Sequence, residues 1–120
     1  MRVVQLGEKL SEELLSAAAC GEKVKLRLGR PALARIQAAR QAVEDIVKKG
    51  KPVYGVNTGF GALASESIAA DDVGTLQRNL LLSHAVGCGD DLSAPEKRLA
   101  LLLRIHSMCQ GVSGGRPKVV

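Results

Sequence analysis

The segment from Pro31 to Gly50 constrains the fold most, because it carries a complete helix signature. Pro31 suits the first turn of a helix, and Lys48, Lys49 and Gly50 suit its end. Between these ends the apolar residues recur at helical spacing, namely Ile36, Ala39, Val43, Ile46 and Val47. The segment is therefore predicted to form a long amphipathic helix, which needs apolar partners along one face.

Two other segments carry similar signals. Ser11 precedes two glutamates and an apolar stripe that stops at Gly21, which predicts a short helix. Further along, Ser93 and Glu96 have the spacing of a capping box, and the helix that they begin is predicted to end at Gly111. The inner stripe of that helix is predicted to consist of Leu99, Leu102, Leu103 and His106.

A fourth helix is predicted within "DDVGTLQRNLLLSHAVG", with Asp71 or Asp72 near its start. Steps of three and four along this helix place the following residues on one apolar face: Val73, Leu76, Leu80 and His84. By this pattern His84 is a residue of the core-facing side.

Strands are expected to be few and short. "KVKLRL", residues 23–28, alternates basic and apolar residues as a half-buried strand does, and "PVYGV" is consistent with a short extended piece. The chain has no Trp and 2% aromatic residues, so its core must consist mainly of Leu, Val, Ile and Ala. Together these features predict a mainly α protein with short β strands, an α+β fold.

Charge and cysteine content bear on partners and compartment. Seventeen basic and twelve acidic residues give a net charge of +5, but the basic residues are dispersed without aromatic residues between them, which argues against nucleic-acid binding. The three cysteines are odd in number and widely spaced, which argues against a disulfide framework. With neither a signal peptide nor an apolar run long enough to cross a membrane, we expect a cytoplasmic protein without membrane contact.

The stretch "YGVNTGFG", residues 54–61, contains the only tyrosine and the only phenylalanine of the chain. Its three glycines permit positive φ angles or close backbone approach, so the segment is predicted to be a structured loop. The glycine spacing matches neither of the common phosphate-binding motifs. Two alternatives remain for Tyr54: the residue anchors a turn, or its hydroxyl acts as a general base with the help of nearby positive charge or hydrogen-bond donors.

His84 likewise has two interpretations. On an apolar face it is expected to be a satisfied core histidine, unless that face lines a cleft where a neutral imidazole binds a ligand or relays protons. His84 with Cys88, and His106 with Cys109, also form two pairs at helical spacing that would suit zinc. Because Gly87 interrupts the first pair and neither pair is a CxxC motif, we expect no metal, and buried inert thiols instead.

Three stretches together resemble the N-terminal part of the aromatic amino acid ammonia-lyases, and among these the histidine-specific branch. They are "YGVNTGFG", "LQRNLLLSHAVGCGD" at 76–90 and "RLALLLRIHSMCQGVSGGRP" at 98–117. The stretches occur in the family's order and spacing and cover more than half of the chain. The first is specific enough to make chance agreement implausible.

The resemblance implies an elimination in which L-histidine loses ammonia from the α-carbon and a proton from the β-carbon, giving trans-urocanate. It matches Tyr54 to the tyrosine proposed as the base, and His84, with its neighbour Ser83, to the recognition of the substrate side chain. Arg104 and His106 lie in a matching stretch but gain no catalytic role from it. The residues matched only as shaping the site are Asn57, Thr58, Gly59, Phe60 and Gly61.

The family's electrophile is a methylidene-imidazolone group that forms from an Ala-Ser-Gly triplet, and this chain departs from the pattern there. The nearest stretches are "ALASES" and "GVSGG", neither of which contains the triplet. The chain is therefore expected to be an N-terminal segment of a longer homotetrameric lyase, without activity by itself. Without the rest of the helical bundle, Leu99, Leu102 and Leu103 are expected to be exposed and to favour self-association. The alternative is a small basic helical interaction module that retains the lyase features only as structure.

Overall fold

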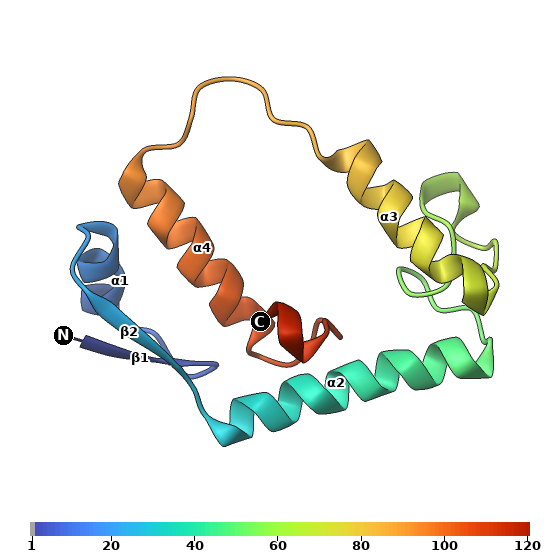
Figure 1. The fold of residues 1–120 in the computed structure, drawn as a ribbon, viewed down its shortest axis with the longest axis horizontal. Coiled ribbons are helices and arrows are strands. Elements are labelled where there is room, and N and C mark those ends of the chain that lie inside the picture. Colours follow the sequence, from blue (N-terminus) through green and yellow to red (C-terminus); the bar gives the residue numbers. More distant parts are fainter. Residues whose placement is uncertain (1) are drawn as a thin grey trace. The chain divides into compact units, whose positions relative to one another are not determined.

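The computed structural model describes residues 2–120 and divides into two units, one up to residue 41 together with 90–120, the other 42–89. The predicted mainly α architecture with short strands is confirmed (Figure 1). In chain order the elements are β1 (Arg2–Leu6), α1 (Glu12–Ala19), β2 (Val24–Leu28), α2 (Arg30–Lys49), η1 (Gly61–Leu63), η2 (Ala70–Asp72), α3 (Val73–His84), α4 (Ala94–Met108) and η3 (Pro117–Val119).

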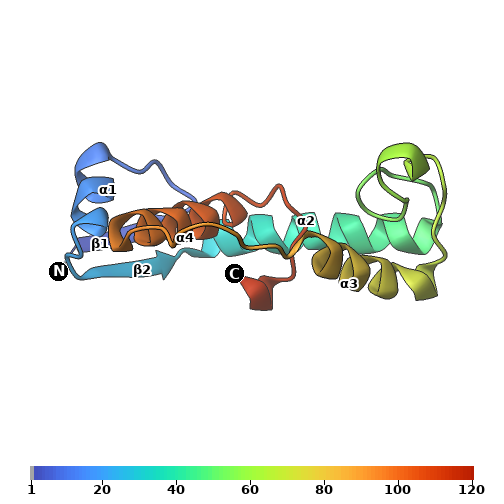
Figure 2. The ribbon, with the colours of Figure 1, turned by 90° about the horizontal axis from the view of Figure 1, so that it is seen from above.

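The first unit begins with a strand, β1, that the sequence did not predict. It pairs in parallel with β2, so that Val4 lies opposite Leu26 and Leu6 opposite Leu28. Helix α1 makes the crossover that a parallel pair requires. In the view of Figure 2 strand β2 lies below α4. The buried side chains of β1, Val4 and Leu6, belong to the core of this unit.

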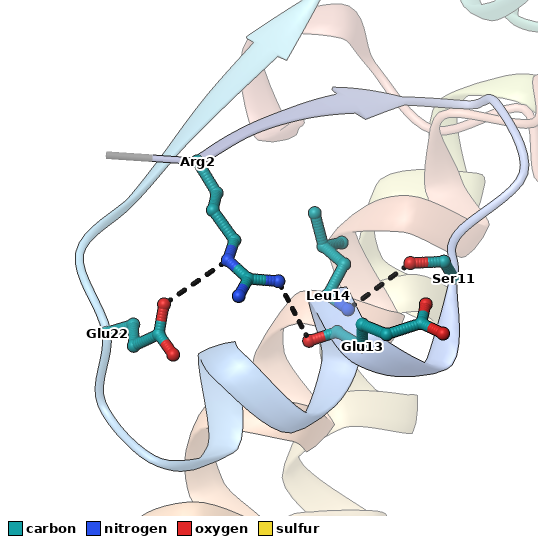
Figure 3. A network of polar contacts seen from close by, with 5 residues as sticks. All are labelled: Arg2, Ser11, Glu13, Leu14 and Glu22. Atoms are coloured by element: carbon teal, nitrogen blue, oxygen red, sulfur yellow. Dashed lines mark hydrogen bonds and ion pairs between the residues drawn. The ribbon is translucent and has the colours of Figure 1, made fainter.

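Helix α1 begins as predicted, with the Ser11 hydroxyl accepting the backbone N–H of Leu14 at 3.3 Å (Figure 3). Arg2 ties the strand to this helix, because its guanidinium donates to the Glu13 carbonyl at 3.4 Å and pairs with Glu22 at 3.3 Å. The Arg2–Glu22 pair is exposed, so it contributes little to stability.

The apolar core of this unit joins both strands to three helices. Its buried members are Val4, Leu6, Ala18, Ile36, Leu102 and Cys109. The capping box of α4 is confirmed at Ser93, whose N–H donates to the Glu96 carboxylate at 2.8 Å. One expectation about α4 is wrong: Leu102 packs in the core and Leu99 is half-buried, so only Leu103 of the three predicted residues is exposed.

A cluster around Gly7 fastens the turn after β1 to two helices. The backbone N–H of Gly7 donates to Nδ1 of His106 at 3.3 Å, and the Gly7 carbonyl accepts from Arg35 at 3.1 Å. Since a backbone N–H can only donate, Nδ1 is the acceptor and the ring proton lies on Nε2. Nε2 is 3.0 Å from the amide nitrogen of Gln110, so the Gln110 amide accepts this proton only when it is turned to place its oxygen there. His106 therefore holds the N-terminal strand against α4.

The second unit consists of the end of α2, a looped segment with two short 3-10 helices, and α3. "PVYGV" is not the extended piece that was expected, because the N–H groups of Val56 and Asn57 both donate to the Val53 carbonyl and form a turn. None of the buried hydrophobic side chains of the described residues lies between 42 and 89. Across residues 2–120 no helix is both long and apolar enough to span a bilayer.

Candidate functional site

The loop that carries Tyr54 is organised by the buried side chain of Asn57. Its Oδ1 accepts the backbone N–H of Val53 at 2.8 Å, and its Nδ2 donates to the Lys51 carbonyl at 3.1 Å. Its own carbonyl accepts the N–H of Ile68 at 2.9 Å. The side-chain amide therefore satisfies the backbone before Tyr54, and the main chain of Asn57 ties the end of the turn to Ile68.

A second set of contacts closes the loop one residue later. Thr58 is buried and forms an antiparallel bridge with Ser67, and the N–H of Gly59 donates to the Glu66 carbonyl at 3.0 Å. A side chain at residue 59 has no room, because an added Cβ would lie 2.5 Å from the Leu63 carbonyl oxygen. The closure accounts for the glycine at this position.

Tyr54 itself projects from this closed loop. Its side chain is 64% exposed, and its ring meets that of Phe60 edge to face, with 5.8 Å between centroids. Gly55, with φ of 79°, reverses the chain directly after it. Within the described part of the chain the Tyr54 hydroxyl makes no hydrogen bond, so its oxygen is available to a ligand while the ring contacts Phe60.

Ser83 and His84 lie together at the last turn of α3. Nδ1 of His84 is 2.9 Å from the Leu80 carbonyl and 3.0 Å from the Ser83 hydroxyl. Because a carbonyl can only accept, Nδ1 carries a proton, which makes Nε2 the acceptor in the neutral form of the ring. His84 is exposed, so the expectation of a core histidine is wrong, although Val73, Leu76 and Leu80 are half-buried as predicted.

The predicted site residues thus form two groups within the second unit. Residues 54–61 share one loop, whereas Ser83 and His84 lie at the end of α3. The chain therefore presents an exposed phenol and an exposed imidazole from different parts of the unit. A substrate that touches both has to bridge the space between them.

The cysteines do not extend this site. Helix α3 ends at His84, so His84 and Cys88 are not separated by a helical turn, and Cys88 and Cys20 are exposed, contrary to the expected burial of Cys88. Cys109 is buried, as expected. Residues 2–120 contain no group of three or more His, Cys, Asp and Glu side chains arranged for a metal ion.

Asn57 has a structural role in the site that the sequence analysis did not predict. It was predicted only to shape the site, whereas its amide makes both side-chain hydrogen bonds that close the Tyr54 turn. An asparagine among glycines is a common signal for a turn, but the pattern does not show that the side chain is buried.

Comparisons with known proteins identify the family. The model of the family described as aromatic amino acid lyase matches residues 10–120. A histidine ammonia-lyase of Burkholderia cenocepacia (strain HI2424) is 48% identical over 99 residues, which is 82% of this chain and 20% of that protein. This chain therefore spans about a fifth of the length of the curated relatives that it matches.

Solved structures give the same result. A histidine ammonia-lyase from Trypanosoma cruzi is 36% identical with a TM-score of 0.82, over 97% of this chain and 22% of that one. A tyrosine aminomutase from Streptomyces globisporus is 28% identical with a TM-score of 0.86, over 99% and 22%. On this evidence the chain belongs to the aromatic amino acid lyase family.

Proposed function

We propose that this chain is the N-terminal segment of a histidine ammonia-lyase and supplies two groups to its active site. Its identity to proteins named histidine ammonia-lyase supports this choice over the aminomutases, which are less identical to it. In the complete enzyme the reaction is the elimination of ammonia from L-histidine to give trans-urocanate. The observation that carries the proposal is the exposed Tyr54 hydroxyl on a loop closed by buried polar side chains.

Tyr54 is the base in this proposal. In its phenolate form its oxygen takes the proton from the β-carbon and becomes the phenol, and the electrons of that C–H bond form the double bond to the α-carbon. The C–N bond of the substrate ammonium breaks, and its electron pair leaves with ammonia. The edge-to-face contact with Phe60 and the hydrogen bonds of Asn57 limit the motion of the phenol. A base held in this way loses less entropy on reaching the transition state.

His84 binds the side chain of the substrate. Its Nε2 is an acceptor because Nδ1 donates to the Leu80 carbonyl, so it suits the N–H of the substrate imidazole. Ser83 supports the orientation of His84 through the 3.0 Å contact with Nδ1. Binding and proton abstraction are therefore assigned to different groups of this unit.

The methylidene-imidazolone group does not fit the residues of this chain. It needs an Ala-Ser-Gly triplet, and the two nearest sequences have glutamate after Ala64-Ser65 and valine before Ser113-Gly114. We therefore derive no step through this group. The proposal assigns it to the rest of a longer cytoplasmic, homotetrameric enzyme and expects the 120-residue chain alone to be inactive.

A graft tests the proposal. The matched region of the Burkholderia cenocepacia relative is replaced by this chain, and formation of urocanate from L-histidine is followed by its near-ultraviolet absorbance. The graft is expected to be active, and Tyr54→Phe to reduce kcat by at least about a hundredfold, as the loss of a general base does. Phe60→Leu, which keeps the hydroxyl, is the matched control and is expected to retain more activity.

The separate role of His84 gives a second readout. His84→Ala in the same graft is expected to raise KM for L-histidine more than it lowers kcat, because binding is its assigned contribution. A folded graft without activity would contradict the proposed equivalence of this segment. Full activity of Tyr54→Phe would contradict the assignment of the base.

A further inference from the structure

The apolar side chains of β2 are more exposed than those of the neighbouring strand β1. Val4 and Leu6 of β1 are 1% and 6% exposed, whereas Leu26 and Leu28, their partners on the same face of the sheet, are both 39% exposed. The described sheet has only these two strands, so β2 has no neighbour on its other side. The exposed apolar surface of the sheet therefore lies on β2, the strand whose other edge is unpaired.

A groove of about 260 Å³ lies along this face of β2 within the first unit. Its apolar wall is formed by Val24 and Leu26 of β2 and by Leu101, Leu102 and Ile105 of α4. Leu101 is 65% exposed although it lines the groove. The groove is therefore bounded by a helix on one side and by a strand with an unpaired edge on the other.

The opposite face of β2 is basic. Lys25 and Arg27 alternate with the groove-lining residues and are exposed, and among the ion pairs of the described residues neither takes part. An added strand places side chains directly opposite these residues, where opposite charges stabilise a pair and like charges destabilise it. A second copy of β2 would set basic residues against basic residues, so the edge disfavours self-pairing.

We propose that the free edge of β2 binds an extended polypeptide segment in which apolar and acidic side chains alternate. Its apolar side chains enter the groove beside Leu26 and Leu101, and its acidic side chains face Lys25 and Arg27. Its backbone extends the sheet by one strand, as in β-strand addition. This site lies in the first unit and does not depend on lyase activity.

The test uses the 120-residue chain and a fluorescein-labelled peptide in which valine and glutamate alternate, with binding measured by fluorescence anisotropy. A peptide of the same composition with its valines and glutamates in separate blocks is the control for charge alone. The alternating peptide is expected to bind at least about tenfold more tightly than the block peptide, because only the alternating order satisfies both faces. Equal binding of the two peptides would overturn the proposal.

Charge reversal gives the decisive comparison. The double variant Lys25→Glu with Arg27→Glu is expected to lower the affinity for the valine–glutamate peptide by about tenfold. The same variant is expected to raise the affinity for an alternating valine–lysine peptide by about tenfold. Lys48→Glu with Lys49→Glu, a basic pair at the end of α2, is the matched control and is expected to leave both affinities unchanged. Equal effects of the two double variants would overturn the proposal.

Two structural measurements distinguish a bound peptide from a second copy of the chain at the edge of β2. Amide resonances of residues 24–28 are expected to shift on peptide addition, and Leu26→Asp, which places a charge in the groove, is expected to abolish the shifts while circular dichroism shows the helices intact. A dimer of the chain that forms without peptide and is lost with Leu26→Asp would show that a second copy fills the edge instead. Either that result or shifts confined to other residues would refute the acidic-strand assignment.

Discussion

Replacing His106 tests how the N-terminal strand is held in the fold. His106→Ala removes the acceptor of the Gly7 N–H, which lies 3.3 Å from Nδ1 in a partly buried site, and also removes the partner of Gln110. Leaving such a donor without an acceptor costs about 1–3 kcal/mol in the free energy of unfolding. Alanine is the better helix former, which offsets about 0.6 kcal/mol of this cost.

We therefore expect His106→Ala to destabilise the chain by about 1.4 kcal/mol. For a chain of this size that corresponds to a fall in Tm of about 6 °C. The assay is thermal and urea unfolding followed by far-ultraviolet circular dichroism, with the free energy of unfolding obtained by linear extrapolation.

The matched control is His106→Asn. The Oδ1 of asparagine occupies a position close to that of Nδ1 in histidine and can accept the same N–H of Gly7, whereas the contact with Gln110 is lost. Asn is expected to lose less than half as much stability as Ala. The reasoning is refuted if Ala lies within about 0.5 kcal/mol of the unchanged chain, or if Asn is as destabilising as Ala.

Three further predictions concern the loop and the thiols. In Gly59→Ala the new Cβ would lie 2.5 Å from the carbonyl oxygen of Leu63. The variant is therefore expected to lose hydrogen-exchange protection in residues 57–68 while its helical circular-dichroism signal persists. Retained protection would disprove the tight closure of the loop. Asn57→Leu is expected to cost about 2–4 kcal/mol of local opening free energy in the same experiment, because two backbone groups lose their partners, and a smaller change would mean that water replaces the amide. Burial raises the pKa of the Cys109 thiol, so in the native chain a thiol reagent is expected to modify Cys20 and Cys88 and to reach Cys109 only in denaturant; rapid reaction of all three would contradict its burial.

Local signals in the sequence were enough to predict the helices. Ser11 and the Ser93–Glu96 pair mark helix starts because their side chains satisfy backbone N–H groups within a few residues, and the structure shows these contacts. Strand β1 could not be predicted in the same way. Its five residues become a strand by pairing with β2, and that partner lies beyond an entire helix.

Burial in the second unit was harder to predict than helix formation. The stripe that includes His84 is apolar, but its exposure depends on what packs against α3, and helical spacing carries no information about that. The same limit applies to Asn57, whose burial follows from the path of the backbone around it. The loop was predicted correctly as structured, whereas its closure depends on contacts between residues 57–59 and 66–68 that no local sequence signal indicates.

The hydrogen bonds of Asn57 are all local in the sequence, so the Tyr54 loop can be passed between related proteins as one continuous segment. All of its partners lie between Lys51 and Ile68, and the bridge from Thr58 to Ser67 falls within the same interval. The geometry that presents Tyr54 is thus encoded by eighteen consecutive residues, 51–68, and draws no buried hydrophobic side chain from elsewhere. Recombination at the two ends of this interval would therefore transfer Tyr54 to a new sequence together with the hydrogen bonds that position it.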